Sequence, residues 1–162
     1  MPETTLDDRV RRLLLAEHFD DRTRQRLRDL GDVALEGLRA CARGPDRGEA
    51  AVLKARALVA LGDWPADEAV DTLAGALDDR RLENRMRAAA ALGDVATDRA
   101  VSVLADRAEH CDDGVELAAI ARSLARIDRD DAHEALGRLR TSVATDDVRR
   151  QVDLLLDERS AD

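Results

Sequence analysis

Apolar residues recur at helical spacing along the chain. Val70, Leu73 and Leu77 fall on one face of an α-helix, and Val52 and Val59 do the same in the preceding segment. No segment shows the apolar–polar alternation of a β-strand. The pattern predicts ten helices, at about residues 5–18, 21–30, 33–43, 48–61, 65–78, 81–92, 97–109, 114–127, 130–141 and 146–157.

An internal repeat organises these helices. The tripeptide Leu-Gly-Asp occurs at residues 30–32, 61–63 and 92–94, at intervals of 31 residues, and Leu124 continues the series 32 residues later. The chain 1–162 therefore reads as one domain of five two-helix units, at about residues 5–30, 33–61, 65–92, 97–127 and 130–157. Because a single unit cannot bury its apolar stripe alone, the units must stack. We predict an all-α fold, a right-handed α-solenoid of about five antiparallel helical hairpins.

Residues at the expected helix ends support these boundaries. Gly62 and Gly93 follow Leu61 and Leu92, where a left-handed glycine can end a helix, and we expect that role for both. Thr5, Thr97 and Thr145 each precede an acidic residue by no more than three positions, so we expect these threonines to be N-caps.

The aspartates of the repeat, Asp32, Asp63 and Asp94, have two structural interpretations. Each could accept hydrogen bonds from free N–H groups at the start of the next helix. Each could instead pair with the cation of its own or an adjacent unit, which would give an ionic ladder between Lys54 and Arg85. Both interpretations assign the aspartates to stability and leave binding to other residues.

The repeat resembles the HEAT-repeat proteins, and in particular the short HEAT-like repeats named after phycobilisome lyases. Their unit begins approximately Val-Arg-x-x-Ala-x-x-Ala-Leu-Gly, which Arg85, Ala88 and Leu92 match, as do Lys54 and Ala57 one unit earlier. The resemblance extends over residues 20–157, although the fourth unit has leucine and the first has threonine in place of the basic residue. It implies an armadillo-like solenoid in which the helix with the Val-Arg start lies on the concave side. The family includes scaffolds, adaptors and lyases, so the resemblance alone does not choose a function.

Charge and composition exclude several classes of function. Hydrophobic residues make up 44% of the chain and charged residues 38%, while Phe19 and Trp64 are the only aromatic residues. A net charge of −9 opposes non-specific binding to nucleic acid or anionic membranes. Two aromatic residues are too few for a base-stacking platform. No apolar run approaches the roughly 20 residues that span a bilayer, and the acidic start is unlike a signal peptide, so we expect a cytoplasmic protein.

The chain shows no pattern typical of a catalytic or metal site. His18, His110 and His133 lie in different predicted units, and Cys41 and Cys111 lack metal-ligand spacing. His133 and its neighbouring glutamate form the one His-Glu pair, which is too little for a two-iron site. We therefore expect a protein that is not an enzyme, with no catalytic residue, metal or cofactor.

Basic residues concentrate on the helices expected to line the concave side. The first three such helices, together with Arg80, carry ten basic and four acidic side chains, although the whole chain is acidic. These cations could simply offset acids on neighbouring helices, or they could line a groove for an acidic peptide or protein, because arginine binds carboxylates with two parallel hydrogen bonds. The candidate partner-binding residues are Arg22, Arg26, Lys54, Arg56, Arg81, Arg85 and Arg87.

Two functions follow from this pattern. The first is a non-enzymatic scaffold or adaptor that binds a protein partner along its concave face. The alternative is an accessory or chaperone-like subunit of a lyase that acts on a chromophore or cofactor protein. A polar pocket near His133 would favour this alternative.

Overall fold

The computed structural model describes residues 7–143 and 146–160 and contains helices and connecting turns, with no β-strand in that part of the chain. The predicted and observed helices correspond one to one, and the largest difference is in the first, which is shorter than expected. The observed helices are α1 (Asp8–Leu14), α2 (Asp21–Arg28), α3 (Asp32–Ala42), α4 (Gly48–Leu61), α5 (Asp67–Ala76), α6 (Leu82–Val95), α7 (Asp98–His110), α8 (Gly114–Arg126), α9 (Asp130–Ser142) and α10 (Asp146–Ser160).

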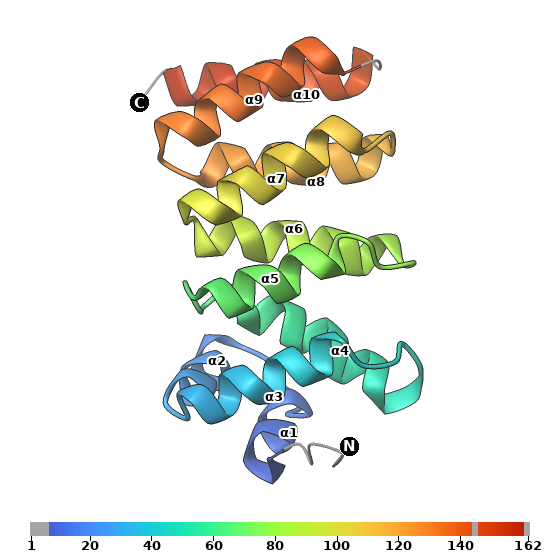
Figure 1. Ribbon diagram of the computed structural model, residues 1–162, viewed down its shortest axis with the longest axis vertical. Helices are drawn as coiled ribbons and strands as arrows, with labels where there is room; N and C mark the ends of the chain where they lie inside the picture. The colour runs from blue at the N-terminus through green and yellow to red at the C-terminus, as the bar shows by residue number, and fades with distance from the viewer. Residues whose placement is uncertain (1–6, 144–145, 161–162) are drawn as a thin grey trace.

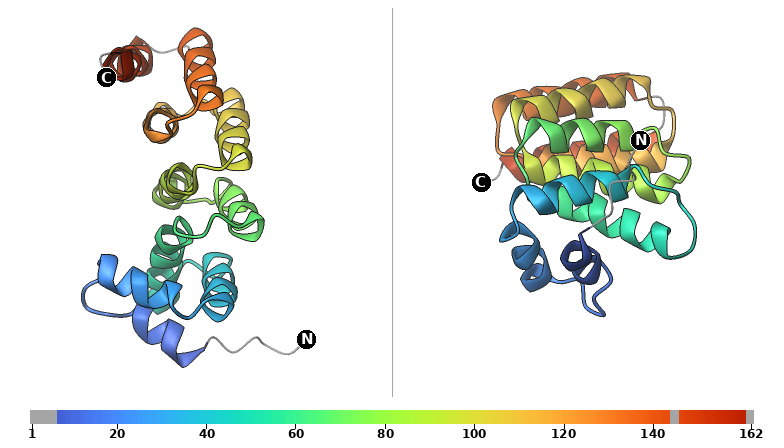
Figure 2. Two further views of the ribbon diagram at one scale, coloured as in Figure 1. Left: turned by 90° about the vertical axis from the view of Figure 1, so that its left-hand side faces the viewer. Right: turned by 60° about the horizontal axis from the view of Figure 1, so that its bottom comes forward.

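The helices stack in two rows (Figures 1 and 2). Helices α3, α5, α7 and α9 form one row, and α4, α6, α8 and α10 form the other. Each helix packs against its hairpin partner and against the next helix of its own row. The second row lies on the inside of a gentle curve (Figure 2), so we call it the inner row and the first the outer row. The predicted stack of about five helical hairpins is confirmed.

One continuous hydrophobic core runs between the two rows. It extends from Val10 in α1 to Val152 in α10, and leucines such as Leu58, Leu92 and Leu124 are completely buried in it. Burying apolar surface stabilises a fold by roughly 25 cal/mol for each Å². Since neighbouring hairpins share this core, no unit buries its apolar stripe independently of the next.

Two of the three repeated glycines, Gly62 and Gly93, serve close packing. Gly62 directly follows α4, as predicted, but neither glycine has the predicted left-handed conformation, and Gly93 does not end its helix. Gly62 has φ of −60°, Gly93 lies inside α6, and the left-handed residue after α6 is Ala96 with φ of 53°. A Cβ atom at Gly93 would lie 2.9 Å from Cβ of Ser123 on α8, and one at Gly62 would lie 3.2 Å from Cβ of Asp94 on α6. These glycines therefore occur where successive inner helices approach most closely.

The N-cap prediction can be checked at one threonine. The Thr97 hydroxyl accepts a hydrogen bond from the backbone N–H of Ala100 at 3.3 Å, which confirms its role, whereas Thr5 and Thr145 lie outside the described residues. Aspartates that the sequence analysis did not single out, Asp20 and Asp113, cap α2 and α8 in the same way. Side-chain caps thus fix the start of helices in both rows.

The first unit departs from the regular stack. Helix α1 packs against both α3 and α4 and covers the apolar end of the core. Helix α2 projects from the inner side of the stack (Figure 2), and only Thr23 and Leu27 of its side chains are buried. The first unit therefore closes the stack and leaves most side chains of α2 at the surface.

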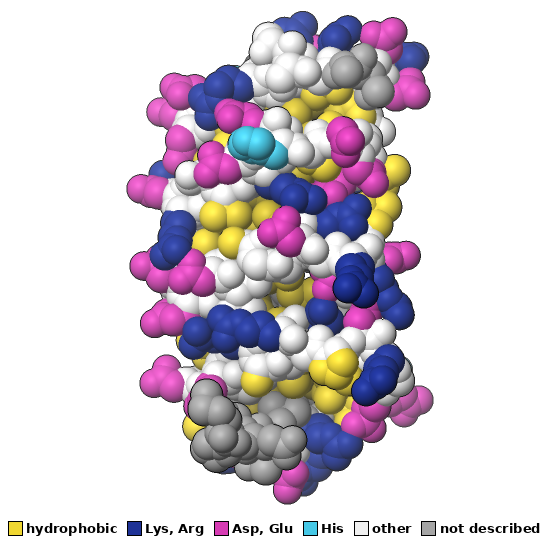
Figure 3. All heavy atoms as spheres, turned by 45° about the vertical axis from the view of Figure 1, so that its right-hand side comes forward, with side chains coloured by type: hydrophobic (Ala, Val, Ile, Leu, Met, Phe, Trp, Pro, Cys, Tyr) yellow, Lys and Arg dark blue, Asp and Glu magenta, His cyan; other side chains and the backbone are white. Residues whose placement is uncertain are grey.

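Much of the surface is a mosaic of charge. Over the face shown in Figure 3, acidic and basic side chains lie interspersed, and hydrophobic side chains show only in small patches. Within the described residues, none of the helices has the length and apolar character needed to cross a membrane.

Candidate interaction surface

A groove lies between α4 and α6 on the inner row. Its volume is roughly 750 Å³, and we call it the inner groove. It combines apolar side chains of α4 with polar and charged side chains at the start of α6. It is lined by Asp46, Ala51, Val52, Ala55, Arg56, Val59, Arg81, Glu83, Asn84 and Arg87. Three of the seven predicted partner-binding residues, Arg56, Arg81 and Arg87, are therefore brought together here.

The α4 side of the inner groove is apolar and partly open. Val52, Ala55 and Val59 follow one another along one face of α4, and Val52 is 44% exposed. Arg87 from α6 donates a hydrogen bond to the Asn84 side-chain oxygen at 3.1 Å and makes no ion pair with another described residue. A small apolar strip beside a cation without a carboxylate partner suits a peptide that carries both apolar and acidic side chains.

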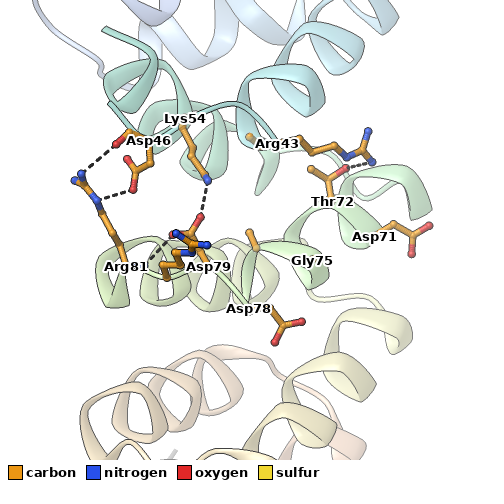
Figure 4. A pocket seen from close by; sticks show the side chains of 12 residues that line it. Arg43, Asp46, Lys54, Asp71, Thr72, Gly75, Asp78, Asp79 and Arg81 are labelled. Carbon is orange, nitrogen blue, oxygen red and sulfur yellow. Dashed lines mark hydrogen bonds and ion pairs between the residues drawn. The ribbon is translucent and has the colours of Figure 1, made fainter. Parts of the chain in front are cut away.

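Two predicted residues, Lys54 and Arg85, hold adjacent units together. The Lys54 ammonium lies 2.5 Å from a carboxylate oxygen of Asp79 (Figure 4), and both side chains are about 10% exposed. Arg85 donates to Glu116 on α8 at 2.7 Å, and Arg107 donates to the other oxygen of Glu116 at 2.6 Å. Both cations are thus neutralised by acids of the following unit, as one of the two interpretations of the basic residues proposed.

These pairings set the acidity of the carboxylates. Burial alone raises the pKa of Glu116, but hydrogen bonds from Arg107 and Arg85 outweigh burial and hold that pKa below its ordinary value. The pKa of Asp79 is lowered in the same way, since burial is outweighed by hydrogen bonds from Lys54, the Arg81 backbone and Asn84. Both carboxylates are therefore ionised at neutral pH and serve the stack.

Arg56 binds the segment between α1 and α2. Its guanidinium donates to the backbone oxygens of Leu14 and Ala16 at 2.8 and 2.6 Å, and it lies 5.4 Å from the centre of the Phe19 ring. Arg56 thus anchors the capping unit to α4 and at the same time forms one wall of the inner groove.

Arg81, the residue before α6, also lines the inner groove. Its Nε lies 2.6 Å from the Asp46 carboxylate, and a terminal nitrogen donates to the Asp46 backbone oxygen at 3.1 Å (Figure 4). The Arg81 side chain is 58% exposed, so this ion pair is strongly screened by solvent.

The two predicted cations of α2, Arg22 and Arg26, are exposed. Neither makes an ion pair with another described residue. The alternate arginines, Arg24 and Arg28, instead contact the carboxylate of Asp63 at the end of α4, at 2.5 and 2.9 Å. One set of arginines thus fixes α2 to the stack, and the other is presented to solvent.

The repeated aspartates do not cap helices. The residues that precede α3, α5 and α7 are Gly31, Ala66 and Thr97, and Asp32 is itself the first residue of α3. The capping interpretation was therefore wrong, because Asp32 lies within α3 and Asp63 and Asp94 each lie three residues before the N-cap of the next helix.

The ladder interpretation correctly predicted ion pairs between adjacent units, but the cations in these pairs are not Lys54 and Arg85. Asp63 pairs with Arg24 of the preceding unit, and Asp94 pairs with Arg126 of the following unit at 3.1 Å. The cations of the repeat pair with acids that sequence reasoning missed. These acids, Asp46, Asp79 and Asp113, stand just before the inner helices at intervals of 33 and 34 residues, a spacing that could have revealed them.

The histidines do not converge. His18, His110 and His133 are all exposed, and the lining residues of the inner groove do not include His133. In the described part of the chain, no three histidine, cysteine, aspartate or glutamate side chains are grouped so that they could hold a metal ion.

Comparison with known families identifies the repeat. A family model for HEAT repeats matches residues 35–125, which is more than half of the chain. The chain belongs to the HEAT-repeat family. The matched segment begins in α3 and ends in α8, so it includes the inner groove. The finer resemblance to the repeats of phycobilisome lyases stays a prediction, and a search of curated proteins finds no match. HEAT-repeat proteins are commonly protein-interaction scaffolds, and the fold is typically non-enzymatic.

Proposed function

We propose that this HEAT-repeat protein is a non-enzymatic scaffold or adaptor in the cytoplasm that binds an acidic segment of a partner protein along its inner row. The observation that carries the proposal is the inner groove, where an apolar strip on α4 faces the unpaired guanidinium of Arg87. The exposed Arg22 and Arg26 belong to α2, which projects on the inner side of the stack (Figure 2) and so adds cations near this face.

The contact residues differ in their availability. Arg22, Arg26 and Arg87 have no carboxylate partner in the described chain, so binding a partner's carboxylate breaks no existing ion pair. Arg81 must give up its ion pair with Asp46 to bind a carboxylate of the partner. This costs little free energy, because the pair is exposed. Lys54 and Arg85 support the surface from within the stack and do not contact the partner in this proposal.

The interaction should depend on many modest contacts. A rigid stack presents a surface that is already ordered before binding, which reduces the entropic cost of association. Arginine contacts with exposed carboxylates weaken as salt rises. We therefore expect a partner that dissociates when the ionic strength is raised well above physiological values.

Charge reversal tests this proposal. The triple variant Arg22→Glu, Arg26→Glu and Arg87→Glu should lose the partner in affinity capture from native lysate followed by mass spectrometry. These positions are suitable because their side chains make no ion pair that stabilises the described fold. Arg85 is not suitable, since reversing it would bury two carboxylates together.

A control separates charge from position. Arg138→Glu changes an exposed arginine of the outer row, on α9, and should retain the partner. Equal recovery of the partner by the triple variant and the wild type would refute the proposed surface. Loss of the partner in the Arg138→Glu variant as well would refute its location on the inner row.

A further inference from the structure

A second groove opens between residues 33–61 and 65–92, at the edge of the stack (Figure 4). It has a volume of roughly 700 Å³ and is bounded by the end of α3, the loop before α4, the helix α5 and the loop before α6. We call it the edge groove. It shares Asp46 and Arg81 with the inner groove and is otherwise formed by different residues.

Each of the four carboxylates of the edge groove has a cation partner, and Arg107, the partner of Asp78, is shared with Glu116. The pairs are Asp46–Arg81, Asp79–Lys54, Asp71–Arg99 and Asp78–Arg107.

The arginines from α3 are not neutralised. The Arg43 guanidinium donates to the hydroxyl oxygen of Thr72 at 3.1 Å, and Nε of Arg39 donates to the same oxygen at 3.4 Å. Neither arginine forms an ion pair with another described residue, and the same is true of Arg80, which lines the groove from the loop before α6. Two cations one helical turn apart repel each other. Here both arginines donate to the same neutral hydroxyl, so a bound anion would offset the repulsion between their charges.

Thr72 fixes the arginines in position. Its side chain is buried, and its hydroxyl donates a hydrogen bond to the backbone oxygen of Glu68 at 2.8 Å. The Thr72 oxygen is thus oriented to accept from Arg39 and Arg43. Each guanidinium has five N–H donors and uses one on Thr72, which leaves four for a ligand.

We propose that the edge groove binds a phosphate-class oxyanion through Arg43 and Arg80, which line it, with Arg39 reaching the anion from one turn earlier in α3 and Thr72 as a positioning residue. A phosphate monoester carries about −1.5 to −2 charges at pH 7, which matches two or three cations better than the single charge of a carboxylate. Arginine also binds phosphate oxygens in a forked geometry. The site does not depend on the proposed protein partner, because it lies in a different groove.

Titration calorimetry with inorganic phosphate, in a low-salt buffer without other phosphate, tests the site. Arg39→Gln and Arg43→Gln should each weaken phosphate binding by about tenfold, the effect of losing one hydrogen bond to a charged group. Arg122→Gln is the matched control, since Arg122 is an exposed arginine on α8 without an ion pair in the described chain. This variant should bind phosphate as the wild type does.

A second variant tests the groove without changing its charge. Gly75 lines the edge groove within α5, and a Cβ atom placed there meets no atom within 4 Å. Gly75→Leu should therefore fill the groove, abolish phosphate binding and leave the melting temperature unchanged or higher, because leucine is the better helix former. Wild-type phosphate affinity in Gly75→Leu or Arg43→Gln would overturn the proposal, as would an equal loss in Arg122→Gln.

Titration with two further ligands distinguishes the possible anions. If O-phosphoserine binds at least as tightly as inorganic phosphate, the ligand is a phosphate ester. If O-phosphoserine does not bind but inorganic phosphate does, the ligand is the free ion. Succinate that binds as tightly as phosphate would overturn the assignment to a phosphate-class anion.

Discussion

At the scale of single residues, Glu116 has the most demanding environment. Its side chain is 1% exposed and is held between Arg85 of α6 and Arg107 of α7, so three helices converge on one carboxylate. It lies next to Leu117, the position at which the family pattern favours a cation. An acid here is stable only because two arginines surround it.

Removing this charge should destabilise the whole fold. Glu116→Gln leaves two guanidinium groups without their shared carboxylate, and we expect the free energy of unfolding to fall by about 3 kcal/mol. Urea denaturation followed by circular dichroism measures the change. Glu36→Gln, at an exposed glutamate of α3, is the control and should alter stability by less than about 0.5 kcal/mol. Similar losses in both variants would contradict the role assigned to Glu116.

The same carboxylate predicts a pH dependence. Because the pKa values of Glu116 and Asp79 in the folded protein lie below the ordinary values of 4.5 and 3.8, both groups stabilise the fold fully above those values. As the pH falls through this range, the unfolded chain takes up protons first and the stabilisation is lost. The stability difference between the wild type and Glu116→Gln should therefore shrink between pH 6 and pH 3 in urea denaturation. A difference that stays constant over this range would contradict the pKa assignment.

At the scale of helices, the spacing between inner helices is set by glycine. Gly93 faces Ser123 across the contact between α6 and α8, whereas Gly75 in α5 faces open space. The two glycines both lie inside helices, and they differ in what a methyl group would meet.

This contrast gives a matched pair of substitutions. Gly93→Ala should lower the free energy of unfolding by about 1–3 kcal/mol, because a contact of 2.9 Å forces α6 and α8 apart. Gly75→Ala should raise it by about 0.5–1 kcal/mol, since alanine restricts the unfolded chain without a clash. Thermal unfolding of both variants checks the signs. Stabilisation by Gly93→Ala would show that the inner helices do not approach as closely as described.

The helices themselves were predictable from the sequence, and the roles of their end residues were less so. Apolar spacing placed every helix of the described residues, because burial of one stripe dominates helix formation in a stack. The Leu-Gly-Asp signal was assigned to helix ends because glycine and aspartate commonly occur there. The structure uses Gly93 for contact with α8 and Asp94 for a bridge to Arg126, and such contacts between units cannot be inferred from one unit alone.

At the scale of the whole molecule, the predicted basic stripe divides into two groups with different tasks. Arginines such as Arg24 and Arg85 bridge consecutive units, while Arg26 and Arg87 on the same helices have no carboxylate partner among the described residues. The sequence showed where these cations lie along the chain. It could not divide them, because the acids that neutralise one group lie in loops and in later units. The arginines left over by this pairing carry the proposed recognition.

The central claim is that the inner row is the face that recognises a partner. Amide hydrogen exchange, measured on the protein alone and with the partner recovered by affinity capture, tests it most directly. We predict slower exchange in α2, α4 and α6 of the bound protein and unchanged exchange in α5, α7 and α9. Slower exchange confined to α5, α7 and α9 would contradict the claim.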